Sequence, residues 1–174
     1  MRSGTNKYTL YLSLGSNLGD KQKNIKEALD KIEERIGSIA SLSAFYLTTP
    51  VGFQSENIFL NCVCEVTTCI DIYKLFAITQ EIEKEIGREQ KSKDRQYMDR
   101  VIDIDLILAG DQVIDTPELT IPHPRFHTRS FVLDPLYEIA PDLIHPQLGK
   151  SIGELREELQ KKAPYLCHEV SKRR

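Results

Sequence analysis

An α+β fold, with helices packed on a mainly antiparallel sheet, is predicted by three features of the sequence. Polar and apolar residues alternate over residues 9–14 and 59–67, as they do in half-buried strands. A helical apolar period follows each of these segments, and a β-branched run occupies residues 100–108. With one more strand before residues 59–67, the order becomes the split β-α-β arrangement of ferredoxin-like βαββαβ sandwiches. Helices on one face of such a sheet would leave the other face free for a ligand.

Length and composition favour a single domain. The 174 residues, 40% of them hydrophobic, are enough for one buried core. We therefore expect one domain over residues 1–174, with a core at about residues 8–160 and a charged, frayed tail at residues 161–174. The formal net charge of −3 argues against a general affinity for polyanions such as nucleic acid. We also expect a cytoplasmic protein, because the sequence contains neither an apolar run of roughly 18 residues nor the apolar block of a signal peptide.

The four cysteines, Cys62, Cys64, Cys69 and Cys167, are too few and too irregularly spaced for a disulfide framework. A zinc site would need further cysteine or histidine ligands at suitable spacing, which the sequence lacks. We expect the cysteines to be packing residues.

The first strand leads through a glycine-containing turn at residues 15–20 into a helix. Asp20 can cap the helix N-terminus, and Gly37 stands where a helix would end in a left-handed residue. The apolar face of this helix comprises Ile25, Ala28, Leu29, Ile32 and Ile36. A phosphate-binding loop is the alternative for the turn, but the glycine spacing differs from that of a Walker A loop, so a strand-to-helix turn is favoured.

Residues 39–46 form the second predicted strand and residues 59–67 the third. The connection between them, residues 47–58, is longer than an ordinary hairpin loop. Because it contains Pro50 and Gly52, it has a preset shape and can offer backbone groups to a small polar ligand.

The second helix is predicted to begin after Asp71, which can cap it, and to stop at Gly87. Its buried stripe is predicted to comprise Leu75, Ile78, Ile82 and Ile86. Gln80 and Glu83 lie one turn apart on a polar edge of this helix, where plain solvation is the simplest interpretation.

Residues 100–108 contain two carboxylates in an otherwise apolar strand. Because side chains alternate between the two faces of a strand, Asp103 and Asp105 share one face. The apolar side chains expected to point into the core are those of Ile102, Ile104, Leu106 and Leu108. Two like charges at this spacing repel unless a cation lies between them, and carboxylate oxygens suit Mg²⁺. The alternative is a solvated pair of acids that interacts with Lys or Arg side chains.

A charged segment without apolar period, residues 88–100, leads directly into this strand. We interpret it as a flexible basic lid that closes over anionic phosphates. The alternative is a loop that only makes the surface more polar.

His123 lies between Pro122 and Pro124, which hold it in a stiff, extended segment close in sequence to Arg125 and Arg129. It could contact phosphate there, although a single loop histidine is usually a surface group.

A C-terminal extension follows the paired-aspartate strand. It begins with a turn at residues 110–111 and a short strand at residues 113–114. Closing helices are predicted at residues 133–139 and 151–159, the second with a capping box formed by Ser151 and Glu154.

Six segments together resemble a known family. They read LGSNLGD at residues 14–20, FYLTTPVG at 45–52, FLN at 59–61, EKEIGR at 83–88, RVIDIDL at 100–106 and PHPRFHTRSFVL at 122–133. In this order and spacing they resemble the 6-hydroxymethyl-7,8-dihydropterin pyrophosphokinases of folate biosynthesis, also called 2-amino-4-hydroxy-6-hydroxymethyldihydropteridine diphosphokinases.

The resemblance implies an ATP-dependent diphosphotransferase. The terminal pyrophosphate of ATP would pass to the hydroxymethyl oxygen of the dihydropterin, with release of AMP. Asp103 and Asp105 match the family's ligands for two Mg²⁺ ions, which act together with ATP as the co-substrate. Arg88 and Arg100 match catalytic arginines that grip the phosphates.

The resemblance also implies two sets of binding residues. The ATP site would comprise Gln80, Glu83, Leu106, Thr120, His123 and Arg129. The pterin site would comprise Thr48, Pro50, Val51, Phe59, Asn61 and Phe131. The two phenylalanines would stack on opposite faces of the pterin ring, whereas core packing is their alternative interpretation.

Two other functions compete with this one. A ferredoxin-like RNA-binding module without catalysis would need an RNP1-type aromatic strand and a basic sheet, and the sequence has neither. A Mg²⁺-dependent phosphohydrolase would use water in place of the pterin. We expect small-molecule substrates, no nucleic-acid or membrane partner, and a monomer or weak homodimer.

Overall fold

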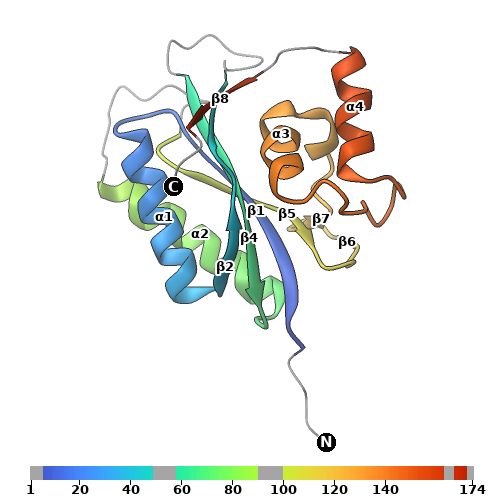
Figure 1. The fold of residues 1–174 in the computed structure, drawn as a ribbon. Helices are drawn as coiled ribbons and strands as arrows, with labels where there is room; N and C mark the ends of the chain where they lie inside the picture. Colours follow the sequence, from blue (N-terminus) through green and yellow to red (C-terminus); the bar gives the residue numbers. More distant parts are fainter. Residues whose placement is uncertain (1–5, 49–57, 90–99, 163–166, 172–174) are drawn as a thin grey trace, which may run out of the picture.

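The computed structural model describes residues 6–48, 58–89, 100–162 and 167–171 (Figure 1). The first half contains β1 (Tyr8–Ser16), α1 (Lys21–Arg35), β2 (Ser38–Leu42), β3 (Phe45–Thr48), β4 (Phe59–Thr68), α2 (Ile72–Glu89) and β5 (Asp103–Ala109). The second half contains β6 (Ile114–Asp115), β7 (Thr120–Ile121), a 3-10 turn (Phe126–Thr128), α3 (Ser130–Ile139), α4 (Ile152–Lys162) and β8 (Cys167–Ser171).

The main sheet has the strand order β5-β1-β4-β3-β8, and β2 pairs with β4 beside β3. Neighbouring strands in this sheet run antiparallel. The predicted ferredoxin-like βαββαβ arrangement is confirmed, because β2 and β3 together occupy the place of the second strand. A separate two-stranded sheet pairs β6 with β7, where β6 begins one residue later than predicted.

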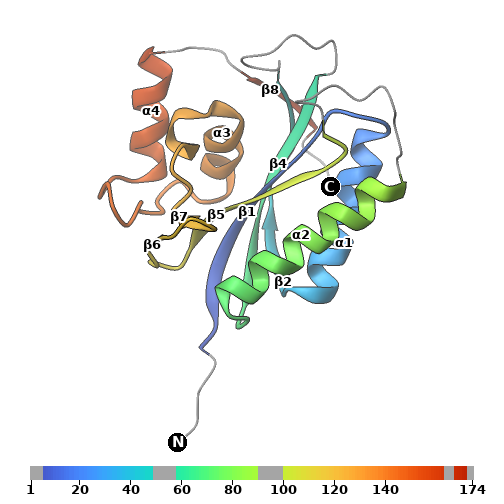
Figure 2. The ribbon, with the colours of Figure 1, turned by 180° about the vertical axis from the view of Figure 1, so that it is seen from behind.

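Helices cover both faces of the main sheet. α1 and α2 lie side by side on one face, and α3 and α4 lie on the other (Figures 1 and 2). This second layer packs on Tyr11, Val63, Ile107 and Leu108 of the sheet. The expectation that one face is left free is therefore wrong in part, since α3 and α4 cover some of it.

The larger core lies between the sheet and the layer of α1 and α2. All five predicted apolar positions of α1 are buried in this core, and Asp20 caps the helix by accepting a hydrogen bond from the Lys23 N–H (3.1 Å). Cys62 and Cys64 pack in the same core, as predicted. Cys69 is exposed, so the packing interpretation is wrong for that cysteine.

Gly37 does not end α1 in a left-handed conformation, so that prediction is wrong. The glycines with positive φ in the described chain are Gly19, Gly110 and Gly149, and the C-cap of α1 is Ile36. Gly37 is instead a point of close approach: a Cβ atom there would overlap the carbonyl oxygen of Thr67 in β4. A side chain at this position is excluded by the neighbouring strand, not by the helix end.

The single strand predicted at residues 39–46 is divided into β2 and β3. At the break, the Ser43 N–H donates to the Val63 carbonyl (3.0 Å), and the Val63 N–H donates to Ser43 Oγ (3.0 Å). A side-chain hydroxyl thus replaces a backbone carbonyl in the ladder, which interrupts the regular strand.

Asp71 caps α2 as predicted, accepting hydrogen bonds from the N–H groups of Tyr73 (3.1 Å) and Lys74 (3.3 Å). Leu75, Ile82 and Ile86 form the predicted buried stripe, while Ile78 is only partly buried and Thr79 is buried. The helix continues to Glu89, so Gly87 does not stop it. A glycine inside a helix costs only about 1 kcal/mol relative to alanine, which the surrounding packing can offset.

Ile102, just before β5, and Ile104 and Leu106 in β5 face the α1 and α2 core as predicted, but Leu108 does not. Leu106 pairs with Leu12, whereas Leu108 pairs with Tyr11, so Ile107 is an extra residue on this strand. Such a bulge reverses the alternation. Leu108 therefore joins Ile107 in the core under α3 and α4.

The C-terminal extension is more ordered than predicted. α3 begins three residues earlier, at Ser130, and α4 has the predicted capping box, in which Ser151 and Glu154 exchange hydrogen bonds of 2.8 and 3.1 Å. The prediction of a frayed tail from residue 161 is wrong at residues 161–162, which end α4, and at residues 167–171, which form β8 on the edge of β3. Backbone pairing with a distant strand leaves little trace in the local sequence.

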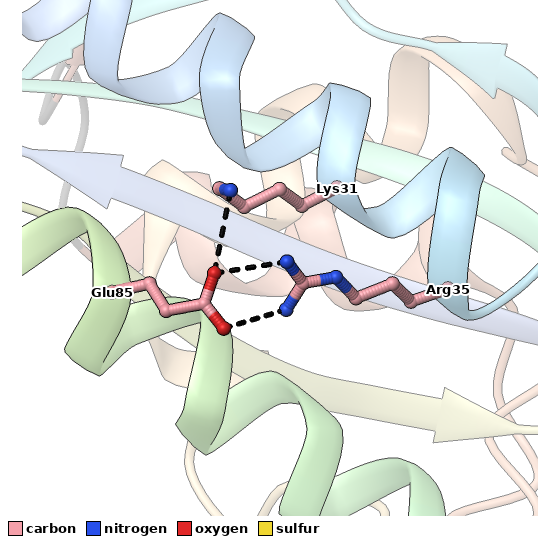
Figure 3. Close-up of polar contacts among 3 residues, drawn as sticks. All are labelled: Lys31, Arg35 and Glu85. Carbon is pink, nitrogen blue, oxygen red and sulfur yellow. Dashed lines mark hydrogen bonds and ion pairs between the residues drawn. The ribbon is translucent and has the colours of Figure 1, made fainter.

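Ion pairs join the two helices of the first layer (Figure 3). Glu85 of α2 accepts two hydrogen bonds from the Arg35 guanidinium of α1 (2.8 and 2.9 Å) and lies 3.3 Å from Lys31 Nζ. Hydrogen bonding to Arg35 lowers the pKa of Glu85 to about 2. None of the described helices has the length and apolar character that crossing a bilayer requires.

Candidate active site

One row of paired residues runs across three strands of the sheet. Asn61 of β4 pairs with Gly15 of β1, and Gly15 pairs with Asp103 of β5. Asp105 occupies the next row on the same face and pairs with Ser13. Because Ile104 between the two aspartates is buried against α1 and α2, both aspartates lie on the opposite face, where α3 packs.

The two aspartates lie in a partly buried, acidic environment. Burial, and then the charge of Asp105, raises the pKa of Asp103 to about 6. Burial also raises the pKa of Asp105, while the positive charges of Arg129 and Arg100 oppose that shift. Ionising both carboxyl groups is therefore unfavourable without a further cation, which is the property expected of a divalent-ion site.

A third carboxylate reaches this edge of the sheet from α2. Glu83 Oε2 accepts a hydrogen bond of 2.6 Å from the Ile104 N–H. Burial, together with the charges of Asp103 and Asp105, raises the pKa of Glu83 to about 7, although the hydrogen bond from Ile104 and the charge of Arg100 oppose this shift. Plain solvation is therefore the wrong interpretation for Glu83, although Gln80 one turn away is exposed.

His123 lies beside the acidic pair. Its Nδ1 accepts a hydrogen bond from the Arg125 N–H (3.1 Å), so the neutral ring carries its proton on Nε2. The backbone N–H of His123 donates to the Ile107 carbonyl of β5 (2.9 Å). Burial and then Arg129 lower the pKa of His123 to about 4, against the opposing charge of Asp103. The ring is thus half-buried, neutral and able to donate one hydrogen bond.

The turn at residues 15–20 is a strand-to-helix turn, as favoured, and it also holds the segment before β5. The Asn17 N–H donates to the Arg100 carbonyl (3.0 Å), and Asn17 Oδ1 accepts from the Arg100 N–H (2.7 Å). Asn24 Nδ2 donates to the Val101 carbonyl (3.3 Å) and the Leu18 carbonyl (2.9 Å). Sequence reasoning missed both asparagines. A polar residue next to Ile25 on the buried side of a helix was the available signal for Asn24.

Three of the predicted pterin residues lie together on β3 and β4. Asn61 is buried, and its Nδ2 donates to Thr48 Oγ1 (2.8 Å). Phe59 pairs with Thr48 and is only partly buried. Gly15 makes room for this group, because a Cβ atom on it would lie 2.7 Å from Asn61 Oδ1 and 3.6 Å from the Phe59 ring.

Phe131 comes from the helical layer that faces this row. It lies in the first turn of α3, partly buried against the second core, and the Arg129 guanidinium lies 5.7 Å from the centre of its ring. The alternative of core packing applies in part to Phe131, since one side of its ring contacts that core. Neither phenylalanine is fully buried.

The remaining predicted residues are only partly described. Leu106 is buried in the core between the sheet and the layer of α1 and α2, and α2 also carries Gln80 and Glu83. Thr120 is partly buried on β7. Pro50, Val51, the Arg88 side chain and the lid at residues 90–99 lie outside the described residues.

The donor set suits Mg²⁺ bound together with phosphate. Within the described ranges, no cluster of three His, Cys, Asp or Glu side chains is arranged to hold a metal by itself. Asp103 and Asp105 offer hard carboxylate oxygens, and such pairs bind Mg²⁺ when water and substrate phosphates complete its coordination. Arg100, Arg129 and His123 lie near enough to influence the aspartates and to meet those phosphates.

The fold and this charge arrangement define a class: an α+β phosphate-transferring enzyme with a pair of carboxylates near arginines. The chain matches the family model 7,8-dihydro-6-hydroxymethylpterin-pyrophosphokinase (HPPK) over residues 11–141. The chain belongs to this pyrophosphokinase family.

Relatives agree with this assignment. Over 139 residues the chain is 45% identical to a 2-amino-4-hydroxy-6-hydroxymethyldihydropteridine pyrophosphokinase of Porphyromonas gingivalis, covering 79% of this chain and 94% of the relative. It is 38% identical over 159 residues to the Aquifex aeolicus protein of the same name, covering 91% and 96%.

Solved structures show the same fold. The crystal structure of a Plasmodium falciparum HPPK-DHPS triple mutant with pteroate superposes with a TM-score of 0.72 at 16% identity. The match covers 95% of this chain and 47% of that one, so this chain spans about half of that longer protein.

Proposed function

We propose that the face shared by β1, β4 and β5 is where this pyrophosphokinase transfers the terminal pyrophosphate of ATP to the hydroxymethyl oxygen of 6-hydroxymethyl-7,8-dihydropterin, releasing AMP. One observation carries the proposal: Asn61 and Asp103 belong to the same row of the sheet, separated only by Gly15. A pterin held by Asn61 would therefore lie next to phosphates held at Asp103. This juxtaposition provides the proximity that a two-substrate transfer requires.

Asp103 and Asp105 would hold two Mg²⁺ ions. Bound there, the ions would supply neutralisation of the triphosphate charge and a lower pKa for the attacking hydroxyl group. The raised pKa values of both aspartates support this role, because they indicate carboxylates that gain from a nearby cation.

Arg100, Arg129 and, by family resemblance, Arg88 would bind the phosphates and stabilise the charge that develops during transfer. Neutral His123 would donate its Nε2–H to a phosphate or nucleotide oxygen. Glu83 would act mainly through the Ile104 N–H, which keeps the backbone between the two aspartates in place. Gln80, Leu106 and Thr120 would complete the ATP site.

On the pterin side, Asn61 has one N–H committed to Thr48, which leaves its Oδ1 and its second N–H for the edge of the pterin ring. Phe59 and Phe131, from different layers of the fold, would stack on the two faces of the ring. Pro50 and Val51 would add contacts from the β3–β4 connection.

The proposal includes the location and partners of the enzyme. It would work in the cytoplasm on small molecules, as a monomer or weak homodimer, without nucleic-acid or membrane partners.

The acidic pair and the proposed pterin site favour transfer to a pterin over the two alternative functions. Neither the phosphohydrolase nor the RNA-binding module needs Asn61 beside Asp103.

The test is a product assay with ATP, Mg²⁺ and the hydroxymethyl dihydropterin. We expect AMP and pterin diphosphate in equal amounts, and no AMP when either Mg²⁺ or the pterin is omitted. Release of ADP or free phosphate without pterin would instead indicate the phosphohydrolase. Retention of RNA that weakens steeply with salt would indicate the RNA-binding module.

A further inference from the structure

We propose that Glu138 is a positioning residue that sets the gap between the two aromatic walls of the pterin site. The inference rests on the pterin site proposed above, with Phe59 on β4 and Phe131 on α3. These rings belong to different layers, so their separation depends on how α3 is seated on the sheet. Glu138 joins the same helix to β3 by directional contacts.

The Glu138 carboxylate binds two groups of the β2–β3 segment. The Ala44 N–H donates to it (3.0 and 3.2 Å to its two oxygens), and the Tyr46 hydroxyl donates to Oε1 (2.9 Å). Tyr46 pairs with Asn61, so the contact lies in the row that holds the proposed pterin site. Because Ala44 is buried, its N–H would be left without an acceptor if the carboxylate were removed.

The helix transmits this contact to Phe131. Phe131 and Glu138 are seven positions apart on the ten-residue α3, which places them on about the same side of the helix and about 10 Å apart along its axis. A tilt or slide at Glu138 would therefore move the Phe131 ring relative to Phe59. Pro135 removes one helical hydrogen bond between these positions, so part of the displacement would be absorbed and we expect a moderate effect.

Apolar packing alone does not fix the position of α3 on the sheet as strictly as the Glu138 hydrogen bonds do. Val132, Leu133 and Leu136 pack α3 on the sheet, but apolar contacts have little directionality and permit small shifts of a helix. Beside Glu138 the helix also borders a hollow of about 590 Å³, lined by residues 39–42 of β2 together with Glu138 and Ile139. Without the carboxylate, the C-terminal end of α3 would have room to move into this hollow.

The experiment compares Glu138→Ala, Glu138→Gln and Tyr46→Phe with the unchanged enzyme. For Glu138→Ala we expect the KM for the pterin to rise about tenfold, within what a small misplacement can cost. The KM for ATP and kcat at saturating pterin should stay within about twofold, because the long Arg129 side chain can adjust its rotamers while a stacked ring cannot. Glu138→Gln keeps one acceptor oxygen and Tyr46→Phe removes one hydrogen bond, so both should give smaller rises.

Asp134→Ala is the matched control on the same helix. Asp134 accepts a hydrogen bond from Arg156 Nε of α4 (2.9 Å), so its removal loosens the contact between α3 and α4. We expect an unchanged KM for the pterin. The proposal is wrong if the KM for the pterin rises equally in Asp134→Ala and Glu138→Ala, or if it is unchanged in Glu138→Ala. It is also wrong if Glu138→Ala raises the KM for ATP as much as the KM for the pterin. If Glu138→Ala does not fold, the graded effects of Glu138→Gln and Tyr46→Phe decide in its place.

A parallel Phe131→Ala variant separates this inference from the site on which it rests. If Phe131→Ala leaves pterin binding unchanged, the proposed pterin site is wrong whatever Glu138 does. If Phe131→Ala weakens pterin binding and the Glu138 variants do not, the site stands and the positioning role of Glu138 is wrong.

Discussion

Asn17 and Arg100 hold each other by two hydrogen bonds of opposite direction: the Asn17 N–H donates to the Arg100 carbonyl, and Asn17 Oδ1 accepts from the Arg100 N–H. Asn17 lies in the turn after β1, and Arg100 lies three residues before Asp103. The bonds therefore fasten the approach to β5 against the turn. In this way a turn to which no catalytic side chain is assigned contributes to the position of Asp103 and Asp105, the proposed metal ligands.

For Asn17→Ala we expect losses of both stability and activity. The variant leaves the Arg100 N–H without its acceptor, which should lower the free energy of unfolding by about 1–3 kcal/mol. Because the segment before Asp103 is loosened, kcat should fall by about tenfold. Urea denaturation and steady-state kinetics measure the two effects.

Asp20→Ala is the matched control, because Asp20 lies in the same turn and caps α1 through the Lys23 N–H. Loss of the cap should cost about 1 kcal/mol of stability while kcat is kept. An Asn17→Ala enzyme that is destabilised but fully active would contradict the positioning of β5 through Asn17.

For Asp105→Asn we expect turnover to be abolished and the metal-free protein to be as stable as the unchanged chain or slightly more stable. The reason is that burial disfavours the ionised form of Asp105 without a cation, and the Asp105 charge in turn raises the pKa of Asp103. Thermal unfolding with and without Mg²⁺ and a non-hydrolysable ATP analogue is the measurement. The unchanged protein should be stabilised by the two ligands together, and a variant stabilised just as strongly would refute the metal-binding role.

For Gly15→Ala we expect weaker pterin binding, with the KM for the pterin raised by about tenfold or more. A methyl group there would approach Asn61 Oδ1 to 2.7 Å, and Asn61 cannot move without breaking its hydrogen bond to Thr48. Gly87→Ala is the control, because a Cβ atom on Gly87 has no neighbour within 4 Å. It should stabilise α2 by about 0.5–1 kcal/mol and leave the kinetics unchanged. If both variants bind the pterin with equal affinity, Asn61 is not part of the pterin site.

His123 should titrate with a midpoint near pH 4 in the ligand-free protein, since burial and Arg129 lower its pKa to about 4. Histidine in the unfolded chain titrates near pH 6.5. Between these values the unfolded chain binds a proton that the folded protein does not, so the contribution of His123 is fully present above pH 6.5 and is lost as the pH falls toward 4. An NMR titration of labelled histidine gives the midpoint, and urea denaturation of His123→Gln should show a flatter pH dependence. A midpoint at pH 6 or above would contradict the half-buried, neutral ring.

Much of the fold was predictable because it depends on local patterns. The apolar period of α1, the caps at Asp20, Asp71 and Ser151, and the shared face of Asp103 and Asp105 each depend on residues a few positions apart. The predictions that were wrong depend on distant partners. Gly37 is required by the backbone of β4, and Leu108 changes face because β5 carries one residue more than β1 at Ile107.

For the candidate site, too, features that depend on local patterns were predictable and features that depend on distant partners were not. The paired aspartates and the six family segments were visible in the sequence. The partners of Glu83 and Asn24 were not, because the Ile104 N–H and the Val101 carbonyl that they bind lie 21 and 77 positions away.

By itself, the sequence determined the order of the elements as far as β5, the family and the acidic pair, since these follow from local periodicity and from motifs along the chain. Only the tertiary structure decided that Asn61, Gly15 and Asp103 form one row, that α3 covers part of the same face, and that Glu138 joins that helix to β3. These relationships depend on strand register and layer packing. Both arise when segments far apart in the chain satisfy each other's hydrogen bonds and bury each other's apolar surface.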